Sequence, residues 1–157
     1  MMRSEALIIG LLLIVGSSLA QQLPAAEKPQ NPALSKIEEM KSHAERMNSA
    51  DRARIYADIA RDLVELANQQ FTDGEVEKAQ SSIKEAVTYS EKSAASAQEK
   101  GKKIKNTEIT LRETARRIEE VRRTLAVDDQ PPLVTAVARI EELRRQLLDH
   151  MFGNEKK

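Results

Sequence analysis

The sequence predicts an all-α protein. Apolar side chains recur every three or four residues from Leu34 to Met151, which is the spacing of one helix face. Gly and Pro number only five each, which argues against an all-β chain with many turns. Hydrophobic residues make up 40% and charged residues 32% of the chain, as expected for solvated helices around a narrow core. We therefore expect a single domain, built as an elongated antiparallel helical hairpin or three-helix, coiled-coil-like bundle.

The N-terminus is typical of a secretory signal peptide. Ala6 to Gly16 is apolar, and Ser18-Leu19-Ala20 places small residues where a signal peptidase reads the chain. The apolar run is shorter than the roughly 20 residues that span a bilayer. We expect residues 1–20 to be removed and the mature protein to be secreted or periplasmic, so that it meets a membrane only through the signal peptide. The alternative is an uncleaved N-terminal anchor.

A linker and a first helix follow. Residues 21–33 carry three prolines and no apolar period, which predicts a flexible, Pro-rich linker. Helical spacing then predicts a helix over residues 34–71, with a bend or stutter near Asp51. Alternatively, Ser49 or Asp51 caps a separate second helix. Thr72-Asp73-Gly74 is a stop-and-turn signal, because Gly74 can adopt a left-handed conformation.

A seven-residue period runs through the middle of the chain. Its positions are Val76, Ile83, Ser90, Ala97, Ile104, Leu111, Ile118 and Leu125. Such a period predicts one long helix over residues 75–126, packed along a coiled-coil seam. Gly101 costs about 1 kcal/mol in a helix interior but leaves the phase unchanged. The alternative is a compact four-helix bundle in which the chain breaks at Gly101.

The last helix is predicted over residues 133–151. Asp128-Asp129-Gln130-Pro131-Pro132 ends the preceding helix, since two prolines cannot continue it. Short connections make successive helices antiparallel neighbours, so the expected domain covers residues 34–152. Residues 153–157 are expected to form a disordered tail.

One short motif occurs three times. Residues 36–41, 117–122 and 139–144 read KIEEMK, RIEEVR and RIEELR. Acidic residues three or four positions from basic ones support an exposed helix face, which is the interpretation we prefer. Duplication of an ancestral segment is the alternative.

Residues 60–93 resemble one tetratricopeptide-repeat hairpin. The resemblance rests on Leu63, Leu66 and Ala67 in the first helix, Gly74 in the turn, and Ala79, Ile83 and Ala86 in the second helix. It departs from the family because no second repeat follows in phase and no proline ends the hairpin. Membership of that family would imply protein–protein recognition by a concave helical face.

The chain offers no recognised catalytic set. It contains no Cys, and His43 and His150 form no histidine motif typical of zinc or di-iron sites. Glu39 and His43 share a helix face, which indicates a solvated contact. We expect no enzyme activity, no cofactor and no metal. The alternative from another class is a haem-binding bundle that uses His150 with Met40 or Met47.

A basic cluster surrounds Gly101. It consists of Lys100, Lys102, Lys103 and Lys105, and it could bind an anionic lipid or polymer at the cell envelope. The formal net charge of zero and the lack of interleaved aromatic residues argue against a nucleic acid partner.

The predicted function is therefore that of a small exported, non-enzymatic helical protein that acts through protein–protein interaction. It would work as a scaffold, adaptor or chaperone-like protein, with another protein or a second copy of itself as partner. The candidate interaction or core positions along the seam are Ile83, Ile104, Leu111, Ile118 and Leu125.

Overall fold

The structure, a computed structural model, describes residues 31–153. The expected signal peptide, the linker up to residue 30 and residues 154–157 of the expected tail lie outside the described residues. Residues 31–153 form five α-helices and one short 3-10 helix, with no strand among them. The all-α prediction is confirmed.

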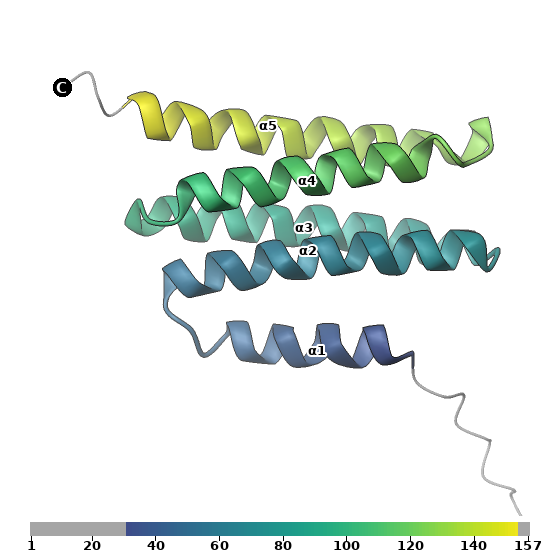
Figure 1. The fold of residues 1–157 in the computed structure, drawn as a ribbon, viewed down its shortest axis with the longest axis horizontal. Coiled ribbons are helices and arrows are strands. Elements are labelled where there is room, and N and C mark those ends of the chain that lie inside the picture. Colours follow the sequence, from purple (N-terminus) through teal and green to yellow (C-terminus); the bar gives the residue numbers. More distant parts are fainter. Residues whose placement is uncertain (1–30, 154–157) are drawn as a thin grey trace, which may run out of the picture.

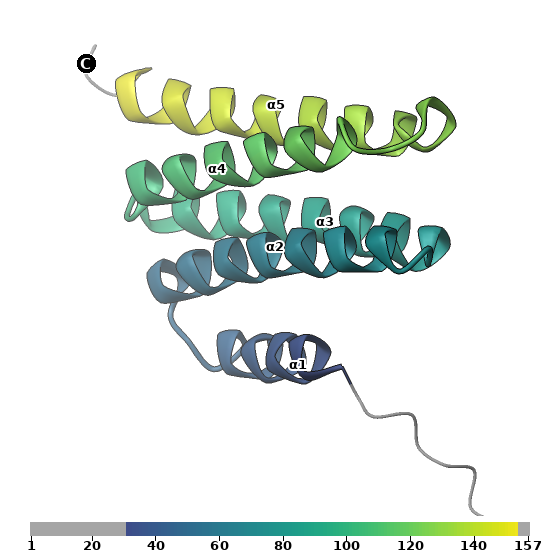
Figure 2. The same ribbon diagram turned by 45° about the vertical axis from the view of Figure 1, so that its right-hand side comes forward.

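The helices are arranged as two stacked hairpins with one additional helix. Their bounds are α1 Pro32–Ala44, α2 Ser49–Thr72, α3 Val76–Lys100, α4 Ile104–Arg122, the 3-10 helix η1 Val127–Asp129 and α5 Pro131–Gly153. Helices α2 and α3 form one antiparallel hairpin, and α4 and α5 form the other (Figure 1). The hairpins stack with α2 against α4 and α3 against α5, while α1 packs on α2 on the far side from α5 (Figures 1 and 2).

The prediction of one helix over residues 34–71 is wrong, because α1 ends at Ala44 and α2 begins at Ser49. The alternative of a separate second helix holds, although its cap is neither Ser49 nor Asp51. The Asn48 side-chain oxygen accepts hydrogen bonds from the backbone N–H groups of Ala50 (3.0 Å) and Asp51 (3.1 Å). These are the otherwise unpaired donors of a helix N-terminus.

The prediction of one helix over residues 75–126 is also wrong. Helix α3 ends at Lys100, and Gly101 adopts a left-handed conformation with φ of 62°. Its N–H donates to the carbonyl of Gln98 at 3.2 Å, so the chain turns back and α4 begins at Ile104. The seven-residue phase survives because the three-residue connection nearly equals one helical turn and both helices face the same core. The elongated three-helix arrangement is therefore replaced by a bundle that breaks at Gly101.

The turn after α2 follows the sequence prediction. Gly74 has φ of 76°, and its N–H donates to the carbonyl of Phe71 at 3.1 Å. The N–H of Glu75 reaches back to the carbonyl of Gln70 at 2.8 Å. This pair of bonds is a Schellman motif, which satisfies the last carbonyls of a helix.

The connection between α4 and α5 is longer than predicted. Helix α4 ends at Arg122 rather than near residue 126, and α5 already begins at Pro131. Proline fits the first turn of a helix because the N–H that it lacks would have no intrahelical partner there. Gln130 holds the connection together: its side chain accepts from Arg122 at 2.6 Å and donates to the carbonyl of Leu125 at 3.0 Å.

The core runs through the whole stack and draws on all five helices. Its largest fully buried side chains include Ile37, Leu63, Ile83, Leu111, Ile118, Ile140 and Leu147. Helix α3 contributes mainly alanines and serines, and small side chains let it approach α2 closely. The hydroxyl of Ser93 donates to the carbonyl of Ala53 on α2 at 2.7 Å, and Ser82 donates to Gln70 at 2.7 Å, so these buried polar groups are satisfied.

The recurring motif makes the same two kinds of contact each time. Its first basic residue reaches a carboxylate on a neighbouring helix, in the pairs Lys36–Asp62, Arg117–Glu65 and Arg139–Glu91, each at 2.7 Å. Its last basic residue pairs with the first glutamate of the motif, in the pairs Lys41–Glu38, Arg122–Glu119 and Arg144–Glu141, each at 2.6 Å. The motif therefore joins helices, beyond the exposed-face role expected from its spacing.

Candidate binding groove

The seam residues predicted from the seven-residue period lie inside the bundle. Ile83, Leu111 and Ile118 are at most 1% exposed, and Ile104 is also buried. Leu125 is half-buried and packs against the edge of the core. In a single chain these side chains are core contacts, and they are not available to a partner.

An open groove lies between α3 and α5, near the N-terminal ends of both helices. Its volume is about 820 Å³. The apolar part of its lining comes from Ile83 and Val87 on α3 and from Pro132 and Ala136 on α5. Of these residues, only Ile83 was predicted from the sequence as a candidate position, because residue spacing alone does not place α5 beside α3.

Charged side chains line the same groove. Glu77 and Lys84 stand seven positions apart on α3, where they share a face, and neither makes an ion pair with another residue of the described part of the chain. Arg139, on the α5 side, is held by Glu91 at 2.7 Å and Glu142 at 2.8 Å. These hydrogen bonds, with Glu91 the stronger influence, raise the pKa of Arg139. The groove therefore combines an apolar lining with one fixed and two unpaired charges.

The predicted basic cluster forms the turn between α3 and α4. Lys100, Lys102, Lys103 and Lys105 are all exposed. Lys103 has φ of 64°, and it is the only non-glycine residue with positive φ in residues 31–153. A side chain in this region costs roughly 1–2 kcal/mol, which Gly would avoid. The turn thus keeps a lysine at a position where its backbone is strained.

The residues of the haem alternative do not come together. Met40 lies on α1 and Met47 just beyond it, whereas His150 lies near the end of α5. Helices α1 and α5 are on opposite sides of the stack (Figures 1 and 2). His43 is exposed on α1, close to Met40 and Met47.

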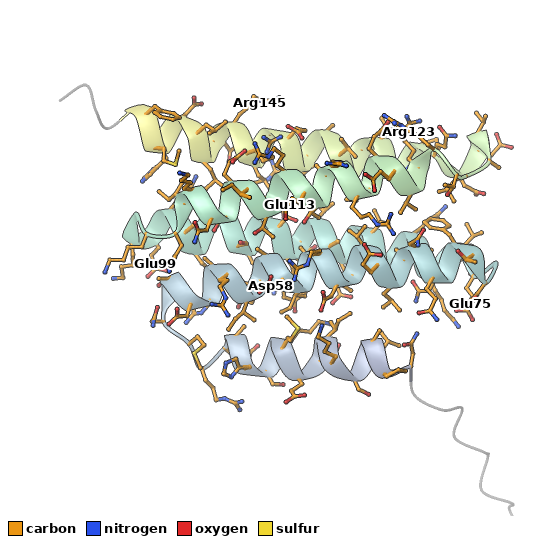
Figure 3. All side chains as sticks on the ribbon, viewed as in Figure 1. Asp58, Glu75, Glu99, Glu113, Arg123 and Arg145 are labelled. Atoms are coloured by element: carbon orange, nitrogen blue, oxygen red, sulfur yellow. The ribbon has the colours of Figure 1, made fainter. Side chains whose placement is uncertain are left out.

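Charged side chains are spread over the outer faces of all the helices, as Figure 3 shows for Glu113 on α4 and Arg145 on α5. Besides Arg139, several other ionisable groups have a pKa that differs from its ordinary value. These groups lie outside the groove and take part in ion pairs or ring contacts. Burial raises the pKa of Tyr89, whose ring lies 4.7 Å from the Lys92 ammonium and 5.5 Å from Tyr56. Lys41 and Arg117 pair with carboxylates on neighbouring helices, whereas Glu119 and Arg122 pair within α4.

Residues 31–153 carry neither a metal-binding cluster of His, Cys, Asp or Glu nor a membrane-spanning helix. No cluster of three or more His, Cys, Asp or Glu side chains that could hold a metal ion occurs there. Within the same range, no helix has the length and apolarity needed to cross a membrane.

Comparisons with known protein families, curated proteins and solved structures found no match. The resemblance of residues 60–93 to a tetratricopeptide-repeat hairpin therefore stays a prediction. The fold and the groove are the basis for a functional proposal.

Proposed function

We propose that this is a small exported, non-enzymatic protein that acts through protein–protein interaction, and that the groove between α3 and α5 binds a helix of its partner. The observation that carries the proposal is this open groove, whose accessible apolar surface comes from the half-buried Val87 and the exposed Pro132, while the buried Ile83 and Ala136 complete its lining. A scaffold, adaptor or chaperone-like role is compatible with such a surface.

The dimensions of the groove favour a short helix. Its lining on α3 extends from Glu77 to Thr88, which is about 17 Å at 1.5 Å per residue. That length accommodates roughly three helical turns. A helix bound in such a groove presents apolar side chains at positions i, i+3, i+4 and i+7.

The charges of the groove favour one orientation. Helices α3 and α5 run in the same direction (Figure 1), so a partner helix that runs antiparallel to both has its N-terminus near Lys84 and its C-terminus near Glu77. Acidic residues stabilise helix N-termini and basic residues stabilise C-termini, because of the helix dipole. A helix with an acidic first turn and a basic last turn therefore complements both unpaired charges.

Site-specific photo-crosslinking tests the groove. A photoreactive residue at Ser81, which is exposed in the groove, should capture a peptide with the three-four apolar spacing, and one at Glu113 on α4 should not. Thr135→Arg should abolish the crosslink, whereas Ala138→Arg, on the same helix but outside the groove, should leave it unchanged. Equal capture from Ser81 and Glu113 would contradict the proposal. A crosslink to a second copy of this chain would identify self-association as the interaction.

Export is tested separately. The mature protein recovered from outside the cytoplasm should begin at Gln21, as N-terminal sequencing would reveal. A membrane-bound product that retains Met1 would contradict this part of the proposal.

The strained backbone of Lys103 favours a second candidate function. In this function, the basic cluster between α3 and α4 binds an anionic membrane surface. Four exposed lysines in one short turn give a local positive charge on a protein whose formal net charge is zero. Each lysine near such a surface contributes about 1 kcal/mol. The protein should co-sediment with phosphatidylglycerol vesicles at low salt but not with phosphatidylcholine vesicles. Lys102→Gln with Lys105→Gln should weaken binding, and Lys78→Gln, in the first turn of α3 at the opposite end of that helix, should not.

A further inference from the structure

A second cavity lies between α1 and α2, on the side of α2 away from α5. Its volume is about 340 Å³, and Met40, His43 and Met47 line it together. Met40 and Met47 are half-buried and His43 is exposed, so a small ion can reach all three from solvent. This cavity is separate from the groove between α3 and α5.

The chain brings the three side chains to one place. Met40 and His43 are three positions apart on α1 and share a face of that helix, while Met47 lies just beyond its end and lines the same cavity. Beyond Ala44 the chain continues in a tight turn, in which the N–H of Met47 donates to the carbonyl of Ala44 at 3.1 Å. The Arg52 guanidinium donates to the carbonyl of Met47 at 2.8 Å and fixes this residue against α2.

The donor atoms on this side are soft. Thioether sulfur and imidazole nitrogen together suit Cu(I), whereas carboxylates suit harder ions. The chain has no Cys, so thioethers are its only sulfur ligands.

The carboxylates of the cavity are already engaged. Asp51 accepts a hydrogen bond from the Asn48 amide at 2.7 Å, and Asp58 pairs with Arg61 at 3.0 Å and Arg54 at 4.0 Å (Figure 3 labels Asp58). Asp51, Asp58 and Arg54 also line the cavity, so the soft donors of Met40, His43 and Met47 are the side chains left to bind an ion.

We propose that Met40, His43 and Met47 bind one Cu(I) ion in the cavity between α1 and α2. The two sulfur atoms and one imidazole nitrogen are the ligands, and the turn fixed by Arg52 positions Met47. The site does not depend on the groove or on any partner protein.

Competitive titration of the full chain tests this site. Cu(I) is added without oxygen in the presence of a chromophoric Cu(I) chelator, and the amount withdrawn by the protein is followed by absorbance. The protein should withdraw one equivalent. Met40→Leu with Met47→Leu should weaken binding at least about ten-fold, and His43→Gln should weaken it as well. Leucine nearly conserves the volume of methionine, so circular dichroism should report an unchanged fold.

Two matched controls keep the test specific. Met151→Leu and His150→Gln change the same residue types on α5 and should leave the affinity unchanged. Ag(I), which has the same soft preference without redox chemistry, should shift the methyl NMR signals of Met40 and Met47 and not that of Met151. An affinity that is the same in the double leucine variant as in the parent, or Ag(I) shifts confined to other methionines, would overturn the assignment.

Discussion

Replacing Gly101 with alanine tests the turn that divides the bundle. Gly101 has φ of 62°, which side chains rarely adopt, and no atom lies within 4 Å of the position that a new Cβ would take. The substitution therefore introduces backbone strain without a steric clash against the rest of the protein. Its effect on stability should come from the backbone alone.

The expected size follows from two opposing effects. A left-handed conformation costs an L-residue roughly 1–2 kcal/mol. The loss of chain freedom in the unfolded state returns about 0.4–1 kcal/mol. Gly101→Ala should therefore lower the free energy of unfolding by about 1 kcal/mol. In a continuous helix the same change would raise it by about 1 kcal/mol, so the two structures differ in sign.

Urea denaturation, monitored by circular dichroism, measures the change in the free energy of unfolding. The slope of this free energy against urea concentration is held common to both proteins. Lys103→Gly is the matched control, since Lys103 has φ of 64° in the same turn. It relieves strain and should raise stability or leave it unchanged. A rise in the urea midpoint of unfolding for Gly101→Ala would refute the left-handed turn at Gly101.

Three further predictions concern the core and the ion pairs. Leu111→Ala should lower the free energy of unfolding by about 2–5 kcal/mol, because the side chain is fully buried between the hairpins, and urea denaturation checks it. Ser93→Ala should cost about 1–2 kcal/mol by removing the hydrogen bond to Ala53, whereas Ser81→Ala at an exposed position should cost almost nothing. A hydrogen bond from Arg122 lowers the pKa of Glu119 to about 2. The pKa of Glu119 is lower in the folded than in the unfolded protein, so the ion pair stabilises the fold above about pH 4.5 and this stabilisation is lost as pH falls toward 2. In thermal melts across that pH range, the melting temperature of Glu119→Gln should fall less steeply with acid than that of the parent.

Helix content was predictable from the sequence because it depends on local spacing. The three-four recurrence identified the helical regions, and Gly74 was recognised as a stop. The breaks before α2 and α4 were weighed as alternatives but not preferred. In both cases a single residue ends the pattern: Asn48 by capping, and Gly101 by adopting a left-handed conformation. The break before α2 registers in the sequence only as a stutter near Asp51, and the break at Gly101 leaves the seven-residue phase unchanged.

The groove was not predictable from the sequence. It exists because the turn at Gly101 places α5 beside α3, and residues such as Val87 and Ala136 are far apart in the chain. Along its own helix, each of them is an ordinary apolar position. The cluster of Met40, His43 and Met47 did have a local signal, namely the spacing of three and then four residues. The haem alternative instead paired these methionines with His150, on a helix that packs on the opposite side of the stack.

The central structural claim is that the chain reverses at Gly101 and thereby builds the groove between α3 and α5. The chain has no native cysteines, so spin labels can be attached at Glu77→Cys and Arg123→Cys and their separation measured by pulsed electron resonance. Figure 3 shows Glu75, near the first site, and Arg123 at the same end of the molecule. We predict a separation within roughly 30 Å, because packed helix axes lie about 8–10 Å apart and the labels add length. One continuous helix would separate the sites by about 69 Å, and a distance near that value would contradict both the fold and the groove.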